Sequence, residues 1–220
     1  MRKLIARLKP HKTVPLTPWT AAHRWDLNVQ RLAILSLGLF LFGIGDSLLI
    51  VANLGNAPWS VLAQGISFRT PLSVGASTFL ISAMVLALWI PLKERPGFGT
   101  LANIVIIAVA IDIGINNVPH PHTFLLQLLY ILLGIFLVGA GSALYITCGL
   151  GSGPRDGWMT SLHKRTGIPV GRVRLMIEVV VLICGWLLGG RLGLGTALFA
   201  LLIGYSVATS FGVVARLTQK

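Results

Sequence analysis

Six stretches of mainly apolar residues, each long enough to cross a bilayer, divide this chain of 220 residues. A helix needs about 20 such residues to span the hydrocarbon core of a membrane. Charged residues make up only 11% of the chain, against about 25% in a soluble domain. The sequence therefore predicts an all-α polytopic membrane protein with six transmembrane helices. The expected spans lie at 32–53, 72–92, 98–117, 124–148, 173–190 and 195–214.

The basic residues indicate which ends of the spans face the cytoplasm. The chain has 18 Lys and Arg residues and 6 Asp and Glu residues, a formal net charge of +12. If the N-terminus is inside, 16 of the basic residues fall in inside segments, and only Arg69 and Arg191 fall outside. Because cytoplasmic segments carry an excess of Lys and Arg, we expect both termini in the cytoplasm. The charges separate apolar stretches and form no basic soluble face, so we expect the lipid bilayer as partner and no nucleic acid.

The sequence also contains an internal repeat. A shift of 96 positions aligns residues 37–58 with 133–154, and 11 of these 22 positions are identical. Each half holds three expected spans, so the second half must lie inverted relative to the first. Inverted repeats with interrupted helices are typical of secondary transporters, although duplication also builds channels and scaffolds. We expect a basic cytoplasmic N-terminal segment at 1–31, repeats at 32–117 and 128–213, an outer connecting loop at 118–127 and a cytoplasmic tail at 214–220.

A loop and a short helix follow the first span of each half, and they predict a binding site. In both loops a glycine ends one helix and a proline begins the next, which predicts short helices near 59–67 and 155–165. We expect Asn56 and Ser152 as their N-caps. The N–H groups of a helix start, with Arg155 added, are suited to a carboxylate or phosphate; the alternative is a tight surface loop that only sets topology. The residues expected to bind substrate are Asn56, Pro58, Trp59, Ser152, Gly153, Arg155 and Asp156.

Three acidic residues lie inside expected spans, where a charge is costly. Asp46 and Asp112 fall at similar heights in the first and third spans. Two nearby carboxylates can share a proton, which would permit proton coupling; the alternative is a hydrogen bond that only packs helices. Glu178 follows Arg174 by four residues on one helix face, which predicts an inner polar cluster or a structural ion pair.

Other chemistry finds little support in the sequence. Cys148 and Cys184 lie in separate apolar stretches and form no disulfide framework. His120 and His122 have no third ligand nearby in the sequence, so we expect no metal and no cofactor. The spans carry no Ser–His pair, and the chain has no His-Glu-x-x-His motif, so we do not expect an enzyme.

Four segments carry a family resemblance: LFGIGDSLLIVANLGNAPWSVL, GLGSGPRDGWMTSLHKRTG, RVRLMIEV and GWLLGGRLGLGTALFALLIG. They resemble the YczE-like bacterial integral membrane proteins, a group related to the YitT family. The resemblance covers nearly everything after residue 32. It implies a bacterial cytoplasmic membrane protein of several spans, and it implies no particular substrate or catalytic residue.

Together these observations favour a small secondary transporter or facilitator of an anionic or zwitterionic solute, coupled to protons through Asp46 and Asp112. A second hypothesis is a non-transporting scaffold or regulator that recruits a protein through the basic loop 155–174. A related alternative is a substrate-binding subunit that acts beside a protein partner. A homodimer is also compatible with the sequence.

Overall fold

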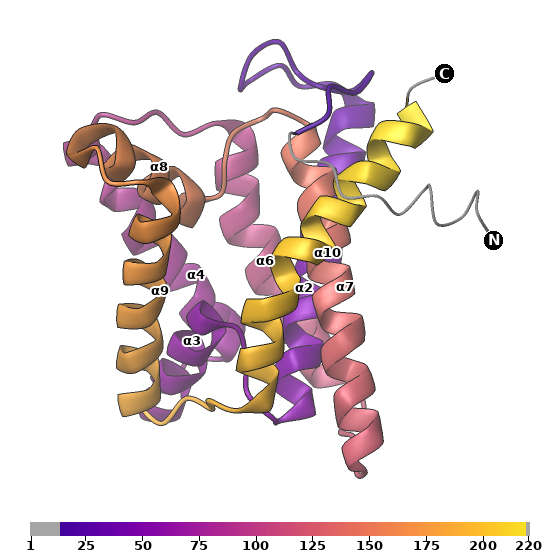
Figure 1. The fold of residues 1–220 in the computed structure, drawn as a ribbon, viewed down its shortest axis with the longest axis vertical. Helices are drawn as coiled ribbons and strands as arrows, with labels where there is room; N and C mark the ends of the chain where they lie inside the picture. Colours follow the sequence, from indigo (N-terminus) through magenta and orange to yellow (C-terminus); the bar gives the residue numbers. More distant parts are fainter. Residues whose placement is uncertain (1–13, 219–220) are drawn as a thin grey trace.

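The computed structural model describes residues 14–218, and the basic stretch at 1–12 lies outside the described residues. The described part is helical and contains no strand (Figure 1). Its helices are α2 (Val29–Ala52), α3 (Pro58–Arg69), α4 (Val74–Ala87), α5 (Trp89–Leu92), α6 (Phe98–Asn117), α7 (Phe124–Thr147), α8 (Pro154–Thr166), α9 (Val170–Leu187) and α10 (Leu194–Thr218).

Five helical stretches between residues 14 and 218 are long and apolar enough to cross a membrane. They are α2, α4 with α5, α6, α7 and α10. Their large apolar side chains are widely exposed on the outside of the bundle, as expected where lipid is the solvent. The remaining expected span, 173–190, coincides with α9, which carries Arg172, Arg174 and Glu178 and falls outside this group.

The helices form two layers (Figure 1). In the long-helix layer, α2 packs on α6 and α7, and α10 packs on α7. In the short-helix layer, α3 packs on α4 and α9, and α8 packs on the same two helices. The main contact between the layers is that of α4 with α6.

Close glycine contacts join α2 to α7 at the centre of the long-helix layer. A Cβ added at Gly38 would lie 2.9 Å from the carbonyl oxygen of Gly141, and one added at Gly45 would lie 2.7 Å from that of Gly134. The order of these contacts runs oppositely along the two helices, so they are antiparallel. Only small residues let two backbones approach this closely in a membrane.

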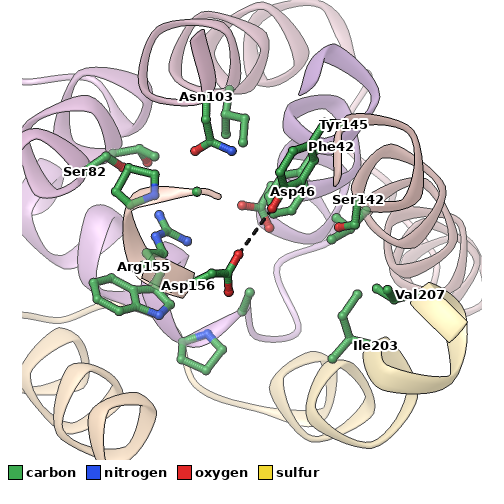
Figure 2. A pocket seen from close by; sticks show the side chains of 18 of the residues that line it. Phe42, Asp46, Ser82, Asn103, Ser142, Tyr145, Arg155, Asp156, Ile203 and Val207 are labelled. Carbon is green, nitrogen blue, oxygen red and sulfur yellow. Dashed lines mark hydrogen bonds between the residues drawn. The ribbon is translucent and has the colours of Figure 1, made fainter. Parts of the chain in front are cut away.

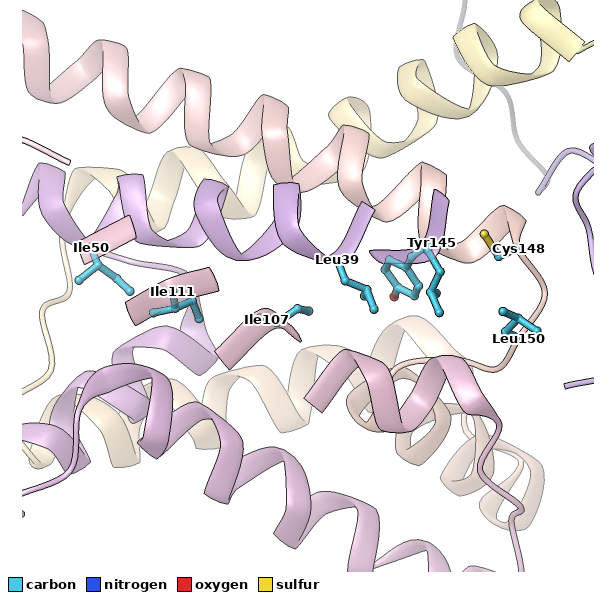
Figure 3. Close-up of a cluster of buried hydrophobic side chains, with 8 residues drawn as sticks. Leu39, Ile50, Ile107, Ile111, Tyr145, Cys148 and Leu150 are labelled. Atoms are coloured by element: carbon cyan, nitrogen blue, oxygen red, sulfur yellow. The ribbon is translucent and has the colours of Figure 1, made fainter. Parts of the chain in front are cut away.

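The contact between α2, α6 and α7 buries one apolar cluster (Figure 3). Leu39 and Ile111 are completely buried, and the Tyr145 ring packs with them. Burying an aliphatic side chain of this kind stabilises a water-soluble protein by about 1.5–3 kcal/mol, relative to leaving it exposed to water. In lipid the gain comes from packing alone, which favours the small residues and tight fit found here.

The loops that follow α2 and α7 make matching contacts 96 residues apart. The N–H of Gly195 donates to the carbonyl of Leu54, and the N–H of Gly99 donates to that of Leu150, both at 2.9 Å. Gly55 and Gly151 occupy the same places in the two loops, with φ angles of 109° and 120° that an L side chain rarely adopts. The two loops are therefore anchored in the same way on the ends of α10 and α6.

One contact breaks this match. Helix α4 packs on α6, where a Cβ at Gly75 would lie against the carbonyl oxygen of Ala108. The corresponding helices of the second half, α9 and α10, barely touch. Gly204, which corresponds to Ala108, has no heavy atom within 4 Å of an added Cβ. Of these two corresponding helix contacts between the layers, only the one between α4 and α6 is closely packed.

Gly45→Ala tests the glycine crossing. The new Cβ would meet the α7 backbone, so we expect a loss of about 1–3 kcal/mol in unfolding free energy. Unfolding of the purified protein in detergent micelles measures it. Gly204→Ala is the matched control and should be neutral, because its Cβ enters open space. Equal effects of the two substitutions would contradict the crossing.

Candidate functional site

A cavity of about 190 Å³ lies between the two layers (Figure 2). It is smaller than the roughly 300–1,000 Å³ typical of sites for drug-sized ligands, so it suits a small solute. The polar groups that line it come from α2, α4, α6, α7, α8 and α9. They are Asp46, Thr78, Ser82, Asn103, Ser142, Tyr145, Arg155, Asp156, Arg174 and Glu178.

Many lining residues occupy positions related by the 96-residue shift. Pro58 and Pro154, which begin α3 and α8, both reach the cavity. Outside α4 and α9, seven such pairs line it, so the two halves contribute equivalent positions to one site. They are Phe42 and Val138, Asp46 and Ser142, Ala57 and Gly153, Pro58 and Pro154, Trp59 and Arg155, Asn103 and Phe199, and Ile107 and Ile203.

Trp59 and Arg155 are one of these pairs, and they touch each other. The Arg155 guanidinium carbon lies 4.7 Å from the centroid of the Trp59 ring, a cation–π contact. Among the described residues no hydrogen bond satisfies this guanidinium, and no carboxylate lies within the 4.0 Å of an ion pair. The five N–H donors of Arg155 are therefore available to a ligand in the cavity.

A carboxylate lies beside the start of each short helix. Ser60, in the first turn of α3, donates to Asp46 at 3.0 Å, and Asp46 is only 2% exposed. On α8 the acid is Asp156 itself, which accepts from the Tyr145 hydroxyl at 3.3 Å (Figure 2). Asp156 corresponds to Ser60 and Ser142 corresponds to Asp46, so each half has one acid and one hydroxyl with the positions exchanged.

The Arg174 and Glu178 side chains form the ion pair that the i, i+4 spacing predicts. Their Nε and Oε1 atoms lie 2.9 Å apart on α9, where both residues line the cavity. A second ion pair fixes the far end of α8, where Lys164 donates to Glu94 at 2.8 Å. The hydrogen bond from Lys164 lowers the pKa of Glu94, which lies in the loop between α5 and α6.

The N-cap prediction for Asn56 and Ser152 is wrong. The helices begin at the prolines, which makes Ala57 and Gly153 the N-caps, and neither caps with its side chain. Neither Asn56 nor Ser152 is among the lining residues. The Asn56 amide is completely buried and donates to Gln64 at 2.9 Å.

The structure does not pair Asp46 with Asp112. Asp112 accepts from the Ser73 hydroxyl at 2.6 Å and from the Gly75 N–H at 2.8 Å, which holds the start of α4. Asp46 binds Ser60 on α3 instead. Although α2 and α6 are neighbours, the two carboxylates accept from different helices and share no hydrogen-bond partner among the described residues, so the structure does not support the expected carboxylate pair.

Five of the seven residues expected to bind substrate line the cavity: Pro58, Trp59, Gly153, Arg155 and Asp156. The sequence reasoning missed Tyr145 and Asn103, which are uncharged polar residues in apolar helices. It also missed the correspondence of Ser60 with Asp156, which the 96-residue shift already contains. Between residues 14 and 218, no three His, Cys, Asp or Glu side chains are grouped to hold a metal ion.

Cysteine labelling tests whether the cavity holds water. In a chain with Cys148 and Cys184 replaced by alanine, Ser142→Cys should react with a small methanethiosulfonate reagent, because a polar cavity of this size admits water. The neighbouring Ala143→Cys is the control and should stay unlabelled until unfolding, since Ala143 is completely buried and outside the cavity. A Ser142→Cys thiol as inert as the control would contradict a water-filled site.

Comparison with known proteins places the chain in a family. A model for a family of unknown function (DUF6198) matches residues 29–210. An uncharacterized protein of Haemophilus influenzae is 42% identical over 209 residues, covering 95% of this chain and 96% of that protein. The uncharacterized membrane protein YczE of Bacillus subtilis is 33% identical over 182 residues, covering 82% of each chain. No solved structure matches.

The resemblance to YczE-like proteins predicted from the sequence is confirmed by the second of these relatives. The family model covers most of the chain, including all the cavity residues. Together with the apolar helices, these matches show that the chain is a bacterial membrane protein that belongs to the DUF6198 family.

Proposed function

We propose that the protein is a secondary transporter or facilitator that binds a small anionic or zwitterionic solute in the cavity between its two layers. The observation that carries the proposal is the placement of Trp59 and Arg155. These residues occupy equivalent positions in the two halves, touch each other and line the cavity. Transporters built from inverted repeats bind their substrates at such a repeat interface, near the ends of interrupted helices.

The paired contacts support two inverted repeats of three spans each. The contact of Gly38 with Gly141 becomes that of Gly134 with Gly45 when both positions shift by 96. Two antiparallel helices related in this way belong to halves of opposite orientation. On this proposal α9 is the sixth span, since its 18 residues extend roughly 27 Å and the charge of Glu178 is neutralised by Arg174.

The difference between the two halves supports alternating access. In this structure α4 is closed against α6 with Gly75 at the contact, while α9 stands away from α10. A shift of 98 for α9 and 96 for α10 places Val173 opposite Gly204, which has room for a side chain. Rocking one layer on the other would close the second contact and open the first, exposing the cavity to the opposite side.

The charge distribution supports the location and orientation. With 16 basic residues on one side and two on the other, the positive-inside rule favours the cytoplasmic membrane with both termini inside. Asp46 is the carboxylate in the cavity for which a proton-coupling role remains. Asp112 is bound to the start of α4, where it serves helix packing.

Uptake into proteoliposomes tests the proposal. The purified protein should accumulate at least one member of a panel of radiolabelled amino acids and small organic acids. Arg155→Ala should lower the initial rate about 10- to 100-fold, because a hydrogen bond to a charged group is worth about 1.5–3 kcal/mol. Arg165→Ala is the matched control and should leave the rate unchanged, since Arg165 lies on the same helix and binds the Pro91 carbonyl.

The contrary outcome would favour the scaffold hypothesis. In that outcome the protein takes up no panel member, and a protein partner that binds the loop 155–174 co-purifies with the full chain in a fixed ratio. A pH gradient that accelerates uptake for the native protein and has no effect in Asp46→Asn would assign proton coupling to Asp46.

A further inference from the structure

The charged groups around the cavity separate by sign. Arg155 lies on one side against Trp59, whereas Asp156 points toward Tyr145 and Asp46 (Figure 2). Neither Asp46 nor Asp156 has a cation within ion-pair distance; each accepts one hydroxyl hydrogen bond. A ligand in the cavity therefore meets the unpaired donors of Arg155 at one end. At the other end it meets the carboxylates of Asp46 and Asp156, which can accept further hydrogen bonds.

The balance of charge decides between solute classes. Arg174 and Glu178 neutralise each other, which leaves one positive and two negative side chains at the cavity. The starts of α3 and α8 add roughly half a positive charge each, so the sum is near zero. A simple anion would face Asp46 and Asp156, and a simple cation would face Arg155 and two helix starts. Only a solute with both charges satisfies both ends.

Apolar side chains also line the cavity. They include Phe42, Val138, Met159, Phe199 and Ile203. An aliphatic side chain on the solute would pack against these apolar residues and displace water from them. The volume of about 190 Å³ limits that side chain to a small one.

We propose that the solute is a small zwitterion with a carboxylate, an ammonium group and an aliphatic side chain, as in alanine, valine or leucine. Its carboxylate binds the guanidinium of Arg155. Its ammonium group lies between Asp46 and Asp156. This inference rests on the proposed transport function and names the solute class for the same site.

The probes are three matched sets. Each contains an amino acid, the amine that lacks its carboxylate and the acid that lacks its ammonium group: L-valine, isobutylamine and isovalerate; L-alanine, ethylamine and propionate; L-leucine, isoamylamine and 4-methylvalerate. The measurement is the thermal unfolding of the full chain in detergent micelles with each probe. At about ten times its Kd, a bound amino acid should raise the Tm by roughly 3–5 °C, whereas its amine and its acid should not.

Two variants separate charge recognition from folding. Arg155→Met keeps an apolar chain over Trp59 and removes the positive charge. This variant should no longer bind the amino acid and should bind the matching amine. Asp156→Asn should shift the preference toward the matching acid. Arg165→Met is the control for the first variant and should keep the native preference, because Arg165 lies outside the cavity.

Two results of the binding measurement would overturn the zwitterion inference. One is a Tm shift with isovalerate or isobutylamine as large as that with valine, and the other is no shift with any of the three amino acids. Uptake of a solute with a single charge would also overturn it and would leave the transport function standing. Binding of an amino acid without its uptake into proteoliposomes would support the zwitterion inference and contradict the transport function.

Discussion

The crossing of α2 and α7 is the contact on which the rest of the structure depends. Gly38, Gly45, Gly134 and Gly141 bring two long helices together backbone to backbone. Because the first two glycines correspond to the second two after a shift of 96, the crossing relates the halves of the chain to each other. The loops that follow these two helices lead to Trp59 and Arg155, which touch each other at the cavity.

This arrangement explains why so similar a pair of halves can form a chemically unequal site. Asp46 and Ser142 hold equivalent positions, as do Ser60 and Asp156, so each half supplies one acid and one hydroxyl in exchanged places. The positive charge enters in the second half alone, where Arg155 replaces the aromatic ring of Trp59. A site of this kind can keep the symmetry needed for two equivalent conformations and still bind an asymmetric solute in one orientation.

Local signals in the sequence predicted the helices and the cavity wall well. Each of the six expected spans falls on a helix, and Pro58 and Pro154 begin the short helices. Proline is favoured at the first helical position, and the same preference explains the error at Asn56, which lies one residue too early to be the N-cap. Arg155 and Asp156 were included in the predicted site because they directly follow the proline that begins the second short helix.

Features that depend on helix rotation and on the packing of separate helices could not be predicted from the sequence. Asp46 and Asp112 lie at similar heights, but height does not determine which neighbour a side chain faces, and Asp112 turns toward Gly75 on α4. The unequal spacing of α4 to α6 and of α9 to α10 also has no local signal. If the proposed alternating access holds, this spacing depends on which of two near-equivalent contacts is formed.

The distance between layers on the two sides therefore tests the account most directly. Spin labels at Phe79 and Val105 report the α4–α6 contact, and labels at the equivalent Ile177 and Leu201 report the α9–α10 gap, in chains with Cys148 and Cys184 replaced by alanine. Double electron–electron resonance should resolve two populations, in which one distance is short when the other is long, with a balance that the bound solute shifts. A single population in which both distances stay fixed, with and without solute, would contradict alternating access.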